Sequence, residues 1–254
     1  MPAPTGLFPR SRKMIQRIGG ASPLRNFLDL LAVRDVSMDA YDFNIKALDT
    51  TNIWTVAAGA TATTWAVRGE AGGWIRGVTG TTAATSGLQL SIPTSYWTGT
   101  SNAGMAILYR LSSINEIRFE AGFVDALPAV NTTIVNNITT PTYNTAATAV
   151  LWMYDHTGST TTTGLYTKGS GVAAAKVATT TRRPVAATEH FVVLQTRGQQ
   201  IEMTCGDDTQ ITATAATAIT AADALIPVVS VKKSDTNSAN VDIDAIIVWS
   251  DRLG

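Results

Sequence analysis

Glu116 and Glu120 are the two carboxylates whose spacing comes closest to that of a glycan-cleaving site. Retaining glycosidases use an acid and a nucleophile whose carboxyl groups lie about 5–5.5 Å apart. On a strand, the two glutamates would share one face with Arg118 between them, and alternate residues of a strand lie about 6.6–7 Å apart along its axis. The glutamates would then be too far apart to cooperate. We interpret Arg118 as a bridge between two surface carboxylates.

Other groups suited to catalysis are sparse. The two histidines, His156 and His190, lie in different segments. The sequence contains no Gly-x-Ser-x-Gly motif that would position a serine nucleophile. Zinc needs three or four Cys, His or carboxylate ligands, whereas the chain has one cysteine, Cys205. We therefore expect no catalytic residue, no metal and no cofactor, and we expect that the protein is not an enzyme.

Two polar turns could bind calcium, which takes only oxygen ligands. Asp207 with Asp208 forms one, and Asp235 with Asn237 and Asn240 forms the other. Asp and Asn are also ordinary turn residues, because their side chains bond to nearby backbone groups. We favour that second interpretation and leave calcium binding open.

Trp97 is the candidate glycan-binding residue, because an exposed indole can stack on a sugar ring. Most of the six tryptophans lie in alternating apolar segments, where an aromatic ring supplies a large buried area. Trp97, within the sequence SYWTGTSN, has the most loop-like surroundings of the six. The competing interpretation is that Trp97 packs in the core or at its edge, and it is the favoured one.

Charge is unevenly distributed along the 254 residues, although 19 basic and 19 acidic side chains leave the whole chain neutral. Residues 1–34 contain six basic side chains and one acidic, a net charge of +5, so residues 35–254 have a net charge of −5. Such asymmetry indicates a binding partner. We favour an acidic protein surface over nucleic acid, because the remainder shows no sign of a basic groove.

Residues 1–36 are expected to form this basic arm and one short amphipathic helix. Ser22 suits the N-cap and Pro23 the first position of a helix over 22–35. A helix this short is marginal in isolation, so its apolar stripe must dock on another surface. The expected anchoring residues are the charges of the arm and the stripe of the helix: Arg10, Arg12, Lys13, Arg17, Leu24, Phe27, Leu28 and Leu31.

The composition excludes several classes of protein. Hydrophobic residues make up 45% of the chain and charged residues 15%, against a usual charged fraction of about 25%. A disordered chain would combine low hydrophobicity with high net charge. No apolar run approaches the ~18 residues of a membrane span, so no membrane partner is expected, and one cysteine cannot make a disulfide framework.

From about residue 39 the hydrophobic pattern alternates with a period of two, which predicts β-strands. Many short strands separated by turn residues, without helices between them, are typical of an antiparallel sandwich or barrel. We expect strands over 39–47, 73–78, 87–92, 103–111, 115–124, 149–155, 164–168, 190–197, 199–204, 225–233 and 241–250.

Two hairpins are expected, one joining 103–111 to 115–124 and the other joining 190–197 to 199–204. The segment 129–148 is long for a structureless loop in a compact domain, and such loops are usually functional or mobile. We favour a surface excursion at one edge of the sandwich over a ligand-binding loop.

The C-terminal third, with HFVVLQTRGQQIEM, ALIPVVSVKK and VDIDAIIVWS, resembles the end of concanavalin A-like (laminin G-type) jelly rolls. The upstream stretch MAILYRLSSINEIRFEAGFVDAL is similar to the opening of that fold in structural proteins of tailed bacteriophages. The resemblance covers residues 37–254. It implies an all-β, antiparallel jelly-roll sandwich, with the arm and helix outside it, and a virion-associated role.

The resemblance and the basic arm together favour a non-enzymatic structural protein of the virion, most specifically a capsid decoration or cement protein. It would be made in the host cytoplasm and lie on the capsid exterior, anchored to the major capsid protein. Because the apolar helix stripe needs a partner in a symmetric lattice, we expect a homo-oligomer and specifically a trimer.

The alternative is a carbohydrate-binding module of a head fibre or tail adhesin that contacts host surface glycans. Trp97 and the loops 129–148 and 157–163 would then line the site. A glycan hydrolase or lyase acting through Glu116 and Glu120 is the least favoured class.

Overall fold

The computed structural model describes most of the chain between residues 36 and 251. The described ranges are 36–43, 47–51, 53–68, 73–93, 97–98, 102–157, 160–169, 175–179, 183–197, 200–205, 209–214 and 224–251. The expected helix over 22–35 and every expected anchoring residue, from Arg10 to Leu31, lie outside these ranges.

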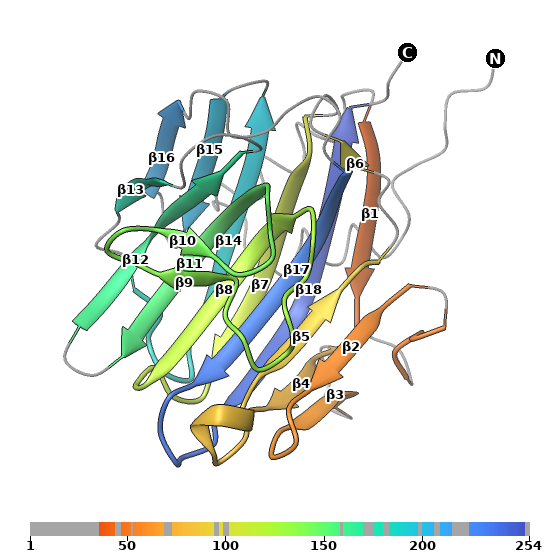
Figure 1. Cartoon of the computed structure of the whole chain (residues 1–254). Coiled ribbons are helices and arrows are strands. Elements are labelled where there is room, and N and C mark those ends of the chain that lie inside the picture. The colour runs from red at the N-terminus through yellow and green to blue at the C-terminus, as the bar shows by residue number, and fades with distance from the viewer. Residues whose placement is uncertain are drawn as a thin grey trace.

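Two antiparallel sheets of eight strands form the body of the molecule (Figure 1). In the first sheet the order is β16-β15-β14-β7-β18-β4-β3, and β1 also pairs with β18. Its strands are β1 (Val36–Asp42), β3 (Thr63–Val67), β4 (Ile75–Val78), β7 (Gly104–Leu111), β14 (Glu189–Arg197), β15 (Gln200–Cys205), β16 (Thr209–Thr214) and β18 (Asn240–Asp251).

The second sheet has the order β13-β12-β11-β8-β17-β5-β2, and β6 also pairs with β17. Its strands are β2 (Thr55–Ala58), β5 (Leu88–Ser91), β6 (Trp97–Thr98), β8 (Ile117–Val124), β11 (Ala149–Thr157), β12 (Thr160–Lys168), β13 (Ala175–Thr179) and β17 (Ala224–Lys233). A short ribbon of β9 (Val135–Asn137) and β10 (Thr142–Tyr143) and a 3₁₀ turn, η1 (Ala83–Thr85), complete the described elements. The predicted all-β, antiparallel jelly-roll sandwich is confirmed.

Of the two predicted hairpins, one is confirmed and one is wrong. Strands β14 and β15 pair antiparallel, with Arg197 opposite Gln200. Strands β7 and β8 do not pair, because β7 lies between β14 and β18 whereas β8 lies between β11 and β17. The chain between them crosses from one sheet to the other, which places the apolar faces of β7 and β8 against each other.

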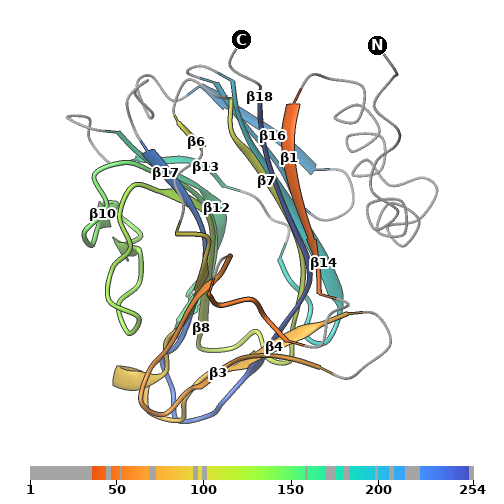
Figure 2. The same cartoon turned by 90° about the vertical axis from the view of Figure 1, so that its right-hand side faces the viewer.

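The core between the sheets is centred on this crossing, and Figure 2 shows the two layers edge-on. The Tyr109 ring of β7 stacks on the Phe119 ring of β8 with 4.5 Å between centroids. Trp152 of β11 meets the Phe119 ring edge-on, with centroids 5.6 Å apart. All three side chains are at most 1% exposed. The period-two alternation of β7 and β8 therefore directs one face of each strand into a shared aromatic core.

The segment 129–148 covers the outer face of the second sheet. Figure 2 shows its β10 ribbon on the side of that sheet away from the first sheet. Ile134 and Val135 are fully buried there against Leu151 and Met153 of β11 and Val228 of β17. The expected surface excursion at the edge of the sandwich is thus wrong in its position, because the outer face of this sheet is apolar and needs a cover.

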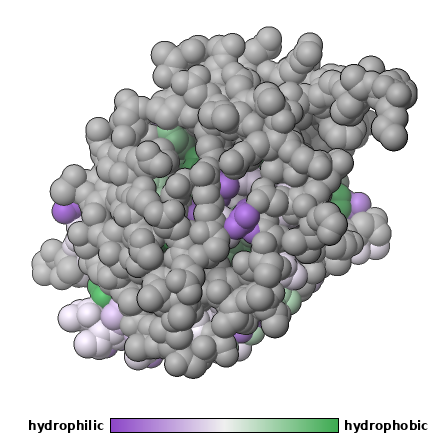
Figure 3. All heavy atoms as spheres, turned by 90° about the horizontal axis from the view of Figure 1, so that it is seen from above, coloured by the Kyte–Doolittle hydropathy of each residue, from purple (hydrophilic) through white to green (hydrophobic). Residues whose placement is uncertain are grey.

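Most buried apolar side chains of the described residues lie in these two clusters, and others, among them Phe191, Ile247 and Trp249, are buried outside them. The one large hydrophobic side chain exposed among the described residues is Val185, at 58%. From above the molecule, Figure 3 shows the described surface as small hydrophilic and hydrophobic areas side by side. No helix in the described part of the chain has the length and hydropathy of a membrane span.

The central aromatic contact predicts a large effect of Phe119→Ala. Removing this ring loses its transfer free energy and leaves a cavity, which together cost about 3–5 kcal/mol for a buried Phe. Urea unfolding should show that loss, whereas Val185→Ala, which truncates an exposed side chain, should change stability by less than about 0.5 kcal/mol. Equal effects of the two variants would contradict the packing described here.

Candidate functional site

Polar side chains meet on the outer face of the second sheet, at one end of β8, β11 and β17. Arg118 of β8 lies opposite Asp155 of β11 and Lys232 of β17 in the strand register. One step along the same face, Glu120 lies opposite Ser230 of β17. This face therefore carries both the apolar patch under the segment 129–148 and the charged groups beside it.

Glu120 fastens the segment 129–148 to the sheet. Its carboxylate accepts hydrogen bonds from the backbone N–H groups of Ile134 and Val135, each at 2.8 Å. The side chain is buried, with the residue 1% exposed. Burial raises the pKa of Glu120 from 4.5 to about 7, against the opposing effects of the Arg118 charge and the two N–H donors.

Arg118 pairs with Asp155 rather than with the two glutamates. Its Nε and Nη2 atoms donate to Asp155 Oδ2 at 3.0 and 2.5 Å, and Nη1 donates to the Val135 carbonyl at 2.6 Å. Glu116 lies before β8 with a φ of 51°, and its Oε2 accepts a hydrogen bond from Ser234 Oγ at 2.7 Å. The predicted bridge between two surface carboxylates is therefore wrong, because Glu120 is buried and Glu116 is off the strand.

This geometry does not bring Glu116 and Glu120 together as an acid and nucleophile. Glu120 lies under the segment 129–148 with both oxygens bonded to backbone amides, so a substrate cannot reach it without displacing that segment. Asp155 holds Arg118 and also accepts a hydrogen bond from Thr157 Oγ1. The described carboxylates of this face are engaged in holding the fold together.

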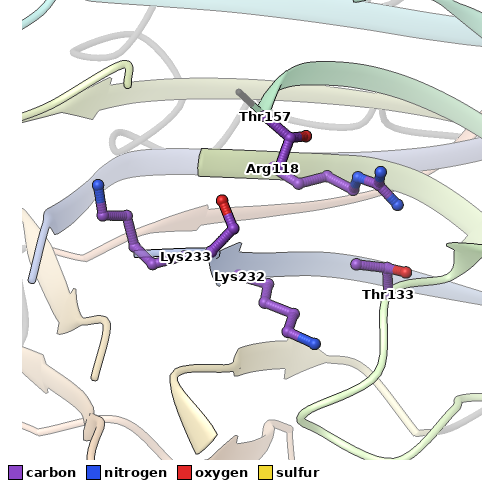
Figure 4. Close-up of a pocket in the computed structure, with 6 residues that line it drawn as sticks. Arg118, Thr133, Thr157, Lys232 and Lys233 are labelled. Atoms are coloured by element: carbon purple, nitrogen blue, oxygen red, sulfur yellow. The ribbon is translucent and has the colours of Figure 1, made fainter. Parts of the chain in front are cut away.

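A hollow of about 210 Å³ lies where the segment 129–148 ends its cover of the sheet. Its lining combines three cationic and three hydroxyl-bearing residues: Arg118, Thr133, Thr157, Lys232, Lys233 and Ser234. Figure 4 shows the Arg118 and Lys232 side chains extending to the side where Thr133 lies, while Lys233 extends the other way. The hollow thus offers hydrogen-bond donors and acceptors with positive charge beside them.

Lys233 is buried and already partnered. Its Nζ donates to the Asn115 carbonyl at 2.6 Å and pairs with Asp235 Oδ1 at 3.0 Å. Asp235 also accepts hydrogen bonds from the backbone and side-chain nitrogens of Asn237. This pattern agrees with the turn interpretation of Asp235, whereas Asp207 and Asp208 lie outside the described residues. Within the described ranges, no group of three or more metal-ligating side chains is arranged to hold an ion.

A second charged cluster occupies the outer face of the first sheet. Asp242 of β18 accepts hydrogen bonds from Arg68, Arg76 and Arg110, at distances between 2.6 and 3.2 Å. Burial opposes ionisation of Asp242, but the hydrogen bonds from Arg76 and Arg110 outweigh it and lower the pKa of this carboxyl. The Arg110 guanidinium also lies 4.8 Å from the centre of the Trp74 ring. We interpret this cluster as a structural tie across β4, β18 and β7.

Trp97 is buried, at 3% exposed, and its backbone pairs with Leu225 of β17 in the strand β6. A sugar cannot stack on a ring inside the core, so the structure contradicts the glycan-binding role considered for Trp97. The competing interpretation of this residue as core is correct.

Sequence reasoning did not identify Asp155 or Lys232 as members of a site, and it included Thr133 only as part of the loop 129–148. Period-two alternation places Asp155 and Lys232 on the outer faces of their strands, but it does not show that these strands flank β8. Thr133 comes from the segment 129–148, whose position depends on contacts with a distant strand. These three residues meet only through the sheet register and the packing of that segment.

No known family model matches the chain, and no curated protein matches its sequence. Solved structures do share its fold at low identity. The carbohydrate recognition domain of Emp47p is 10% identical with a TM-score of 0.57, over 83% of this chain and 94% of that one. LamA from Z. galactanivorans, in complex with laminaritriose and laminaritetraose, is 9% identical with a TM-score of 0.58, over 83% and 97%.

A phage protein is also among the similar structures. The CBM2 module of the evolved Dit protein of Lactobacillus casei BL23 phage J-1 is 14% identical with a TM-score of 0.53, over 87% of this chain and 99% of that one. At such identities these likenesses establish the fold alone. They confirm the concanavalin A-like jelly roll over 83–87% of the chain.

The raised pKa of Glu120 predicts a pH-dependent stability. The folded state holds this proton more tightly than the unfolded state, whose pKa stays near 4.5, so the free energy of unfolding falls as pH rises from about 4.5 to about 7. The pKa difference corresponds to a loss of about 3 kcal/mol. Urea unfolding between pH 4.5 and 8 measures this, and Glu120→Gln should flatten the fall.

The matched control is Glu189→Gln, which removes an exposed carboxyl on β14. This variant should keep the pH profile of the unmodified protein. If Glu120→Gln also kept that profile, Glu120 would not be the group whose proton is linked to folding.

Proposed function

We propose that the protein is a non-catalytic carbohydrate-binding module with a jelly-roll fold. The observation that carries this proposal is the hollow beside the segment 129–148, where Thr133, Thr157 and Ser234 bring hydroxyl groups next to Arg118 and Lys232. Sugars are recognised by such sets of donors and acceptors in a concave site. The fold supports the proposal, since it is shared with a carbohydrate recognition domain and with a protein bound to laminari-oligosaccharides.

We propose a non-catalytic module because the carboxylates near the hollow have structural roles. Glu120 is enclosed by backbone amides and Asp155 is paired with Arg118, so both are committed to structure. A glycosidase needs one carboxyl group to give a proton and a second one free to act on the sugar or on water. The carboxylates described around this hollow do not form such a pair.

A place in a phage virion extends the proposal. The phage J-1 module supports it through its shared fold, and host surface glycans would then be the ligand. A second candidate function is capsid decoration, which the charge asymmetry of the sequence favours: residues 1–34 have a net charge of +5. In that role the arm would bind the major capsid protein on the capsid exterior, and the protein would form a homo-oligomer, with a trimer expected.

Glycan binding is tested with an array of bacterial surface glycans and oligosaccharides, probed with the full chain. We expect a restricted set of glycans to bind and to compete in solution. Thr157→Trp places a large ring at the exposed end of β11 and should fill the hollow, weakening binding at least tenfold. Thr188→Trp makes the same change in an exposed turn of the first sheet and should leave binding intact.

Two results would contradict the proposed glycan site. Binding of no glycan by the folded chain would contradict the function itself. Binding that survives Thr157→Trp would show that sugars are recognised elsewhere on the molecule.

Capsid decoration is tested by co-sedimentation with phage heads that lack the protein. If the arm is the anchor, full-length protein binds at saturating, lattice-like stoichiometry and a version without residues 1–36 does not. Equal binding by both versions would exclude the arm as the anchor, and no binding by either would exclude the decoration function.

A further inference from the structure

Among the described residues, the charges around the hollow leave one cation without a partner. Arg118 is neutralised by Asp155, with 2.5 Å between Nη2 and Oδ2. Lys233 is neutralised by Asp235, with 3.0 Å between Nζ and Oδ1. Lys232 forms no hydrogen bond or ion pair with the described residues, although it lies between these two pairs in the sheet register and sequence. The third nearby carboxylate, Glu116, accepts a hydrogen bond from Ser234.

Lys232 is directed into the hollow rather than away from the molecule. Its residue is partly buried, and Figure 4 shows its side chain extending to the same side as that of Arg118, toward the part of the hollow near Thr133. A partly desolvated ammonium interacts more strongly with an anion than one in bulk water does. An unpaired cation held in such a position is best satisfied by a negatively charged ligand.

We propose that this hollow binds a saccharide through one anionic substituent, a carboxylate, sulfate or phosphate group, held by Lys232. This inference rests on the proposed carbohydrate-binding function and narrows its ligand to acidic glycans. Arg118 donates three N–H bonds to Asp155 and Val135, which leaves two of the five donors of its guanidinium for the ligand. The hydroxyl groups of Thr133, Thr157 and Ser234 are placed to bind the sugar ring beside the anion.

The charge balance also limits the ligand to one anionic group at this site. Of the three cations that line the hollow, Lys232 alone has no carboxylate partner among the described residues, and Asp155 and Glu116, which bond to the lining residues Arg118 and Ser234, would repel further negative charge. A volume of about 210 Å³ lies below the ~300–1,000 Å³ of pockets for drug-sized ligands. The hollow therefore suits one sugar residue with its substituent.

The test compares acidic glycans with their neutral counterparts. The probes are trigalacturonate and its methyl ester, which has the same rings without the charges, together with sialylated, sulfated and phosphorylated oligosaccharides and their unmodified forms. Calorimetric titration of the full chain should show binding of at least one acidic probe at least tenfold tighter than its neutral form. Raising the NaCl concentration from 50 to 500 mM should weaken that binding, because salt screens the charge pair.

Three variants test the role assigned to Lys232. Lys232→Gln should weaken binding of the acidic probe at least tenfold, and Lys232→Arg, which keeps the positive charge, should restore most of it. Lys176→Gln removes a lysine from β13, at the far edge of the same sheet, and should leave affinity unchanged. Unchanged thermal unfolding of the Lys232 variants shows that their folds are intact.

The outcomes separate this inference from the function on which it rests. If the chain binds neutral glycans equally well and Lys232→Gln has no effect, the acidic specificity is wrong and carbohydrate binding stands. If no glycan of either kind binds, both proposals are overturned. Acidic binding that is lost in Lys232→Gln and retained in Lys176→Gln supports the site as described.

Discussion

The structure depends on one constraint: the second sheet is apolar on both faces and must be covered twice. The first sheet covers the inner face, where Tyr109 stacks on Phe119. The segment 129–148 covers the outer face with Ile134 and Val135. Burial of apolar surface contributes roughly 25 cal/mol for each Å² removed from water, so covering each face stabilises the folded state. The long Thr-rich segment 129–148 is therefore part of the core rather than a surface loop at the edge of the sandwich.

Polar groups set the position of this second cover. A short two-stranded ribbon has unpaired backbone amides that lose their hydrogen bonds to water when the ribbon docks on the sheet. A buried donor left without a partner destabilises the folded state. The Glu120 carboxylate accepts hydrogen bonds from two of those amides, and Arg118 donates a hydrogen bond to the Val135 carbonyl. The same contacts bury a carboxylate, which raises its pKa to about 7. The cover is thereby held in one register, and its end defines the hollow near Lys232.

The fold and the proposed ligand stand on different observations. The jelly roll is shared with a carbohydrate recognition domain and with a protein in complex with laminaritriose and laminaritetraose at 9–10% identity, a level that establishes the fold alone. Function belongs to sites placed on a fold rather than to the fold itself. Here part of the outer face of the second sheet is filled by apolar packing and by a buried glutamate, and a polar hollow lies at its end, where Arg118 and Lys232 lie. The inferred preference for an acidic sugar follows from those side chains.

The sequence by itself determined the all-β class, the β14–β15 hairpin and eleven of the strands, because a period of two and a short turn are local properties of the chain. It did not indicate the strands β2, β3, β6, β9, β10, β13 and β16. Only the tertiary structure decided that β7 and β8 lie in opposite sheets, that Trp97 is core and that Glu120 is buried. Alternation shows that a strand has two faces, but it does not show which strands flank it or what covers each face. The hollow depends on all of these, since its residues come from β8, β11, β17 and the segment 129–148.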